Sequence, residues 1–249
     1  MDSYRTWDIA HWPEDIVLCV DVDLEMDSEL KKGHALTRMD AIKQALLMFV
    51  HSKLLMSADH AFSIATIGQG ASWHSHQYLR DFDAISTSIR SLSSQGSYTK
   101  CDLSSLFQLI LPDARASKKR SRAFRVILVY CRSNTVPKFN IHIPDPSLVV
   151  FDALYLHDKP NPSNCPQQVY DALVEILERV HAHSYIFESG GGLTRVLFRH
   201  ICQLLAHPQQ RCLQDDSLPV DLSKPNAPAA ATDGSAQNQV DEKINSLAI

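Results

Sequence analysis

The sequence predicts a doubly wound α/β sheet, mostly parallel with one antiparallel edge strand and with helices on both faces. Continuous apolar runs, such as residues 16–20 and 126–130, are typical of strands buried on both faces of a parallel sheet. These runs alternate with segments whose apolar residues follow helical spacing. A third observation is the turn Gly68-Gln69-Gly70, which joins two strand-like segments and predicts one hairpin within the parallel pattern.

The strands are predicted from their apolar content and from the turn residues that bound them. They are expected at residues 16–21, 61–67, 71–74, 124–130, 148–156 and 185–187. Pro137, Pro144 and Pro146 separate the fourth strand from the fifth. The segment at 71–74 is expected to return along its neighbour as a short antiparallel edge strand.

The helices are predicted from caps followed by apolar residues at helical spacing. Thr37, with Asp40 three positions later, forms a shortened capping box for the first helix. Asp102 is expected to cap a short helix, and the basic residues 115–122 are then expected to form a loop. Further helices are expected at residues 78–92, after Asn164 with Pro166, and after the glycines at 190–192, with Pro208 ending the last one.

Composition divides the chain into three parts. Residues 1–14 are a polar lead-in, 15–212 form the domain, and 213–249 have the Ala-, Asn-, Asp- and Ser-rich composition of a disordered tail. The net charge of −4 argues against bulk binding to nucleic acid. No apolar run is long enough for a membrane span, and the first residues lack the apolar core of a signal peptide. The six cysteines include no Cys-x-x-Cys pair, so reduced, mostly buried thiols are expected.

The strand pattern, with an acidic loop after its first strand, resembles the von Willebrand factor A domain. Within that fold, the sequence is similar to the von Willebrand A-like scaffold subunit of the BRISC and BRCA-A deubiquitinase complexes, the BRISC and BRCA-A complex member one family. The most specific match is Leu204-Leu205-Ala206-His207-Pro208, followed by Gln210 and Arg211. The other matching stretches are residues 21–26, 41–50, 101–110 and 125–130.

The resemblance implies a non-catalytic scaffold without a cofactor, located in the nucleus and the cytoplasm. Its expected partner is a UEV-domain scaffold, the brain and reproductive organ-expressed protein. Through that partner it would join a metalloprotease-type deubiquitinase and an Abraxas-like protein. Such complexes cleave lysine-sixty-three-linked ubiquitin chains, and one of them acts in DNA double-strand-break repair and checkpoint signalling. No direct contact with nucleic acid or membrane is implied.

The acidic loop corresponds to the position where metal-binding von Willebrand A domains hold a cation. Their pattern is Asp-x-Ser-x-Ser with a loop threonine and a further aspartate, whereas this loop reads Asp21-x-Asp23-x-Glu25, with Thr99 as the possible threonine. The aspartate expected after the strand at 124–130 is missing, and Arg132 lies there instead. We therefore expect a degenerate site without metal, in which Arg132 pairs with Asp21 or Asp23 and substitutes for the cation.

Other motifs have weaker functional interpretations. His74 and His76 could share a strand face as metal ligands, but no third ligand is identifiable, which favours surface histidines. Glycines 190–192 could cradle an anion, although a tight turn explains them as well. Asp152, within an apolar strand, could be a buried acid with a raised pKa or could accept hydrogen bonds from a loop. The basic residues at 115–122 resemble a nuclear-import patch, and a solvated loop is the simpler interpretation.

The sequence leaves two functions to compare. The first is the scaffold, for which His207, Pro208 and Arg211 are the candidate partner-binding residues. The alternative is a free-standing von Willebrand A domain that binds an acidic ligand through a metal held by Asp21, Asp23, Glu25 and Thr99. Dependence on a metal distinguishes the two.

Overall fold

The computed structural model describes residues 12–29, 33, 35–143, 145–190 and 194–214. The chain divides into two units, Met1–Asp216 and Ser217–Ile249, and all described residues belong to the first. Most of the predicted tail at 213–249 and most of the lead-in at 1–14 therefore lie outside the described residues. Among the described helices, none combines the length and the apolar character needed to cross a membrane.

The core of the first unit is a six-stranded sheet with the order β3-β2-β1-β5-β7-β8. Only the pair of β2 and β3 is antiparallel, so the predicted fold class is confirmed. The strands are β1 (Glu14–Asp21), β2 (Ala61–Ile67), β3 (Ala71–Leu79), β5 (Ala123–Tyr130), β7 (Val150–His157) and β8 (Ile186–Gly190). Two short strands, β4 (Cys101–Asp102) and β6 (Pro137–Lys138), form a separate parallel pair.

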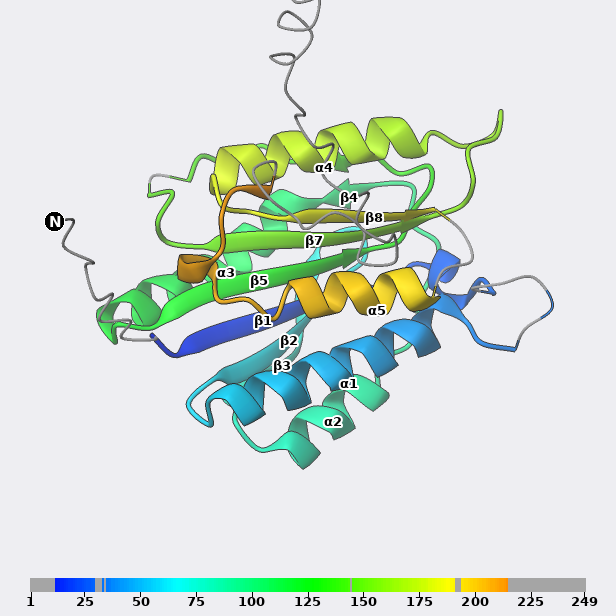
Figure 1. The fold of residues 1–249 in the computed structure, drawn as a ribbon. Coiled ribbons are helices and arrows are strands. Elements are labelled where there is room, and N and C mark those ends of the chain that lie inside the picture. Colours follow the sequence, from blue (N-terminus) through cyan, green and yellow to red (C-terminus); the bar gives the residue numbers. More distant parts are fainter. Residues whose placement is uncertain (1–11, 30–32, 34, 144, 191–193, 215–249) are drawn as a thin grey trace, which may run out of the picture. The chain divides into compact units, whose positions relative to one another are not determined.

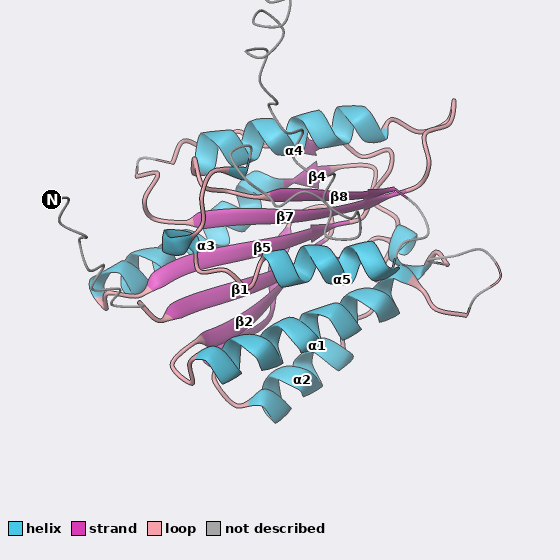
Figure 2. Ribbon diagram, viewed as in Figure 1, coloured by secondary structure: helices cyan, strands magenta, loops and turns pink. Residues whose placement is uncertain are grey.

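Helices cover both faces of this sheet (Figures 1 and 2). They are α1 (Arg38–Met56), α2 (Phe82–Arg90), α3 (Leu103–Lys119), α4 (Pro166–Val180) and α5 (Thr194–Gln203), with short 3-10 helices η1 (Leu24–Asp27) and η2 (Pro208–Gln210). Figure 1 shows α1 and α5 side by side in front of the sheet and α3 behind it. Because strand side chains alternate, Val17 and Cys19 pack with α3 and α4, while Ile16 and Leu18 point to the opposite face.

Two predicted elements differ in extent. β3 runs to Leu79, where a helix beginning at Tyr78 was expected, and α2 begins only at Phe82. The strand alternates half-buried residues such as Trp73 with exposed ones such as His74, a pattern that its many polar residues obscure in the sequence. Strand β3 is accordingly more than twice as long as the predicted return segment.

The predicted basic loop at 115–122 is also corrected. α3 continues through most of it to Lys119, because the buried stripe of the helix extends beyond its large apolar residues to Ala114 and Ser117. These small residues pack against the sheet without marking a helix by their hydrophobicity. Pro112 lies inside α3 on its exposed side, which further obscured the helix in the sequence.

Candidate functional site

The acidic loop lies where the sequence analysis placed it, at the carboxyl end of β1 beside β5. Asp21 is the last residue of β1, and the loop passes directly into η1. Residues 95–98 pack against this loop, since the Leu24 N–H donates to the Gly96 carbonyl at 3.0 Å and the Gln95 N–H to the Val22 carbonyl at 2.8 Å. The loop is thus closed by a segment distant in sequence.

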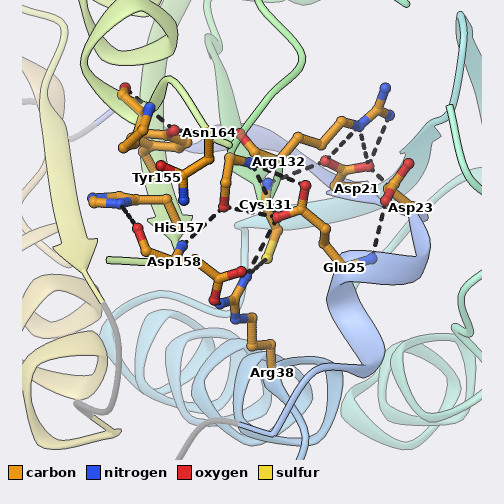
Figure 3. A network of polar contacts seen from close by, with 12 residues as sticks. Asp21, Asp23, Glu25, Arg38, Cys131, Arg132, Tyr155, His157, Asp158 and Asn164 are labelled. Atoms are coloured by element: carbon orange, nitrogen blue, oxygen red, sulfur yellow. Dashed lines mark hydrogen bonds and ion pairs between the residues drawn. The ribbon is translucent and has the colours of Figure 1, made fainter. Parts of the chain in front are cut away.

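Arg132, which directly follows Cys131 at the end of β5, reaches into the centre of this region (Figure 3). Its Nε donates to both carboxylate oxygens of Asp21 at 3.1 and 3.0 Å, and its Nη2 donates to Oδ1 at 2.8 Å. Both side chains are fully buried. The ion pair that the sequence predicts between Arg132 and the acidic loop is therefore present.

Three backbone carbonyls also accept hydrogen bonds from the guanidinium. Nη2 donates to the carbonyls of Ile67 at 3.1 Å and Gly68 at 2.7 Å, and Nη1 donates to that of Lys100 at 3.2 Å. The guanidinium carbon also lies 5.3 Å from the ring centroid of Tyr98 and 5.5 Å from that of Tyr130. All three nitrogens of the Arg132 guanidinium therefore donate to partners within the chain.

Gly68 permits Tyr98 to close the site. A Cβ atom at position 68 would lie 2.9 Å from the Tyr98 ring, so any larger residue there would displace the tyrosine. Tyr98 in turn donates its backbone N–H to Asp23 Oδ2 at 2.7 Å. The space beside the Asp21 and Asp23 carboxylates is thus occupied by the Tyr98 ring and the Arg132 guanidinium.

The other two acids of the loop are bound by the chain as well. Asp23 Oδ1 accepts the Glu25 N–H at 2.9 Å and thereby caps η1. Glu25 accepts the backbone N–H of Ser133 at 2.9 Å and the Ser133 hydroxyl at 2.8 Å. Neutral backbone and hydroxyl donors thus satisfy these carboxylates.

The charges of the central pair depend on each other. Burial raises the pKa of the Asp21 carboxyl, and the Arg132 guanidinium and the Cys131 and Asp23 N–H groups counteract that rise. Burial also opposes the charge on Arg132, but the Asp21 carboxylate outweighs burial and raises the pKa of the guanidinium. The geometry, with three guanidinium contacts to one carboxylate, favours the ionised pair at neutral pH.

These residues do not fit a divalent cation. A cation would have to displace the positive charge of Arg132 from Asp21, and the oxygens of Asp23 and Glu25 point to donors of their own. Thr99, the fourth candidate ligand, is exposed. Among the described residues, no group of three or more His, Cys, Asp or Glu side chains could hold a metal ion.

A second set of polar contacts adjoins the first and was missed by the sequence analysis. Arg38, the first residue of α1, is paired with Asp158, lies 3.8 Å from Glu25, and donates through Nη1 to the Cys131 sulfur at 3.4 Å (Figure 3). His157 Nε2 lies 2.7 Å from a Glu188 oxygen. Cys131 and Asp158 lie far from Arg38 in sequence, so no local motif predicts their contacts with Arg38.

At the amino-terminal end of the parallel strands, a buried ionic cluster surrounds Asp152. Arg125 Nε donates to Asp152 Oδ2 at 2.7 Å, and Arg211 donates to both oxygens at 3.0 and 2.6 Å. Burial by itself would raise the pKa of Asp152, but Arg125 and Arg211 outweigh burial and lower it. The hypothesis of a raised pKa is therefore wrong, and the hydrogen bond from the Tyr185 N–H at 2.8 Å supports the other interpretation.

The candidate partner-binding residues are integrated into this cluster. Arg211 is only 8% exposed, and His207, 6% exposed, bonds to the Trp12 carbonyl at 3.1 Å. Pro208, the first residue of η2, is buried as well. Their side chains therefore have structural roles within the chain. Contact of these three residues with a partner stays a prediction, and their burial leaves little of each side chain accessible for it.

The remaining motifs lie apart. His74 is bonded to Ser91 and His76 to Asp113, so the two histidines do not form a shared ligand pair. Arg120 and Arg122, at the end of the basic segment, pair with Asp15 at 3.2 and 2.7 Å. Of the glycines at 190–192, only Gly190 is among the described residues.

Comparison with known proteins identifies the fold. No family model matches the chain, and a search of curated proteins finds no match. The von Willebrand A domain of SpRpn10 aligns with a TM-score of 0.53 at 12% identity, covering 77% of this chain and 95% of that one. The N-terminal domain of TFIIH p34 aligns with a TM-score of 0.50 at 14% identity, covering 76% of this chain and 96% of that domain.

The PilB minor pilin of Streptococcus sanguinis also aligns, with a TM-score of 0.53 at 7% identity, but this chain spans only 60% of its length. At such low identities the likeness concerns the fold alone. The chain therefore has a von Willebrand A-like fold.

Proposed function

We propose that this chain is a non-catalytic scaffold that stabilises a deubiquitinase complex cleaving lysine-sixty-three-linked ubiquitin chains. Its direct partner in this proposal is the UEV-domain scaffold, the brain and reproductive organ-expressed protein. That protein connects it to the metalloprotease-type deubiquitinase and its Abraxas-like partner. The complex acts in the nucleus and the cytoplasm, with a role in DNA double-strand-break repair and checkpoint signalling.

One observation carries the proposal, namely the buried pair of Arg132 and Asp21. A von Willebrand A domain that recognises an acidic ligand through a metal needs an open coordination position. Here Arg132 and Tyr98 fill that position, and the carboxylates are bound to internal donors. This closed site favours recognition through a surface that does not depend on metal, as expected of a scaffold.

The identity of the complex is supported by the sequence resemblance, most of all by the segment from Leu204 to Arg211. In the structure this segment connects α5 to the buried cluster around Asp152, through Arg211. The absence of catalysis is proposed from the geometry of the site, since the polar groups at the carboxyl ends of the strands are bonded to one another.

The test is co-purification of the chain with the UEV-domain scaffold alone, with and without EDTA. Leaving out the metalloprotease avoids the zinc that EDTA would remove from it. We expect a complex of unchanged amount in EDTA, and a higher melting temperature of the assembled deubiquitinase when the chain is present. Failure to co-purify would refute the proposed partnership. Loss of the complex in EDTA that Mg²⁺ restores would favour metal-dependent recognition instead.

A further inference from the structure

Among the described residues, no strand pairs with the outer edge of β8. β8 is the last strand of the described sheet, and the described strand beside it is β7. Just before β8, the Tyr185 N–H donates to Asp152 and the Tyr185 carbonyl accepts from Ala153, both at 2.8 Å, so Tyr185 faces β7. Because backbone groups alternate along a strand, those of Ile186, Glu188 and Gly190 point away from β7.

The chain itself shows how this edge is used. The side-chain amide of Gln214 accepts the Ile186 N–H at 2.7 Å and donates to the Ile186 carbonyl at 2.6 Å. A primary amide has the same donor and acceptor as a peptide group, so Gln214 lies where a seventh strand would place one. The Tyr185 hydroxyl, which donates to the Cys212 carbonyl at 2.7 Å, holds the segment before Gln214 in place. The outward groups of Glu188 and Gly190 continue the same edge.

The other edge of the sheet is built differently. The pairing of β3 with β2 has two register shifts, between Phe62 and Ile64 and between Ile64 and Ala65. Such irregularities are a common way of protecting an edge strand from further pairing. β8 pairs with β7 in a regular register from Ile186 to Gly190, so its edge remains suited to one more strand.

We propose that the outer edge of β8 binds an extended segment of the UEV-domain scaffold, which pairs with the backbone of Glu188 and Gly190 next to Gln214. The inference rests on the proposed function and specifies the surface used. Addition of a strand derives its affinity from backbone hydrogen bonds and its specificity from side chains.

The side chain of Glu188 indicates the chemistry of this segment. It is 45% exposed and lies beside the edge, with one carboxylate oxygen near His157. A lysine or arginine opposite Glu188 would complement its charge. A second copy of this chain is disfavoured, because antiparallel pairing centred on position 188 would bring two glutamates together across the strands.

The test compares Glu188→Pro with Glu188→Ala in binding to the purified UEV-domain scaffold. Both variants lose the carboxylate, but only proline also removes the outward N–H, and it removes no hydrogen bond to β7. We expect the dissociation constant of Glu188→Pro to be about tenfold higher than that of Glu188→Ala, the effect of losing about one hydrogen bond. Equal dissociation constants for two folded variants would overturn the inference.

Hydrogen–deuterium exchange of the unaltered protein provides a readout that does not depend on folding of the proline variant. The Glu188 amide should exchange more slowly in the complex than in the free chain, and an unchanged rate would overturn the inference. If no complex forms at all, the proposed function fails and the inference falls with it. If a complex forms without protection of Glu188, only the inference fails.

Discussion

Arg132 supplies the positive charge beside Asp21 from the chain itself. A guanidinium makes directional contacts with a carboxylate and with carbonyls at the same time, whereas a divalent cation needs several oxygens converging on a point. Burying two charges is costly, and the additional acceptors, Ile67, Gly68 and Lys100, compensate for the hydration that Arg132 loses. The pair is thus stable only as a complete unit.

Arg132→Met should accordingly be strongly destabilising. Asp21 would remain buried without a cation, which typically costs about 3–5 kcal/mol in the free energy of unfolding, measured by urea denaturation. The double variant Asp21→Asn with Arg132→Met should lose less than the sum of the two single variants, because they share one interaction. A loss no larger than that of the exposed control Arg115→Met would contradict this account.

Two buried histidines predict the response to acid. Burial lowers the pKa of His60 and that of His200 to about 4, below their value in the unfolded chain. The unfolded chain therefore binds more protons below pH 6.5, so stability is complete above that pH and is lost as the pH falls toward 4. Each histidine should contribute about 1–2 kcal/mol to the loss between pH 7 and pH 5.

The check is urea denaturation of His200→Phe at both pH values. The phenylalanine can keep the stacking on Phe187, and it cannot be protonated. This variant should lose less stability between pH 7 and pH 5 than the unaltered protein. The exposed control His142→Phe should lose as much stability as the unaltered protein. An unchanged loss in His200→Phe would show that His200 is protonated alike in both states.

At the scale of elements, the segment after α5 is attached to the sheet by side-chain contacts although it forms no strand in it. Arg211 donates to Asp152 in β7 and to the His183 carbonyl at 2.6 Å, and its guanidinium lies 4.1 Å from the centre of the Tyr185 ring. Lys53 of α1 pairs with Glu14 of β1 in the same cluster. Charged side chains from four elements and this segment are thereby paired in one cluster at the amino-terminal end of the sheet.

Arg211→Met should reveal how far the stability of the chain depends on these contacts of Arg211. Asp152 would retain only Arg125 as a cationic partner, so the free energy of unfolding should fall by about 3 kcal/mol. Hydrogen exchange in residues 207–212 should accelerate, because the segment loses its main attachment. Arg199→Met on the exposed side of α5 provides the control. Equal stability of the two variants would mean that the segment is held by its apolar contacts alone.

The elements differ in how far the sequence predicts them. β1 and β5 are recognisable because burial on both faces leaves an apolar run in each, at residues 16–20 and 126–130. β3 and the second half of α3 are not, because an edge strand has one solvated face and because Ala114 and Ser117 form the buried stripe with small side chains. The pair of Arg132 with Asp21 was predictable since both residues lie at the carboxyl ends of neighbouring strands. Arg38 and Arg211 reach partners that only the tertiary fold brings near.

At the scale of the whole molecule, parallel strands produce two different ends. Their carboxyl ends gather Asp21, Glu25 and Arg132, and their amino ends gather Glu14, Lys53 and Asp152. Both ends are ionic, and at both ends the charged side chains have partners within the chain. Among the described residues, the regular outer edge of β8 is better suited to pairing with a partner than either end of the strands.

Removal of the residues from Pro219 onward should leave the domain intact. That stretch has few large apolar side chains, so it cannot compensate for roughly 1–2 kcal/mol of ordering entropy per residue. The free energy of unfolding should therefore change by less than about 1 kcal/mol, which corresponds to a shift of a few degrees at most. The melting temperature of the truncated chain should stay within about two degrees of that of the full chain. A large decrease would show that this stretch contributes to the core.

The cluster of Arg125, Asp152 and Arg211 also has a consequence for biosynthesis. β5 and β7 leave the ribosome well before Arg211 is translated, so a nascent chain carries Asp152 without one of its two cations. The sheet can reach its final stability only after synthesis has passed position 211. Messages that end earlier would yield chains in which Asp152 has Arg125 as its only cationic partner, and cellular quality control would remove such less stable products rather than allow them to assemble.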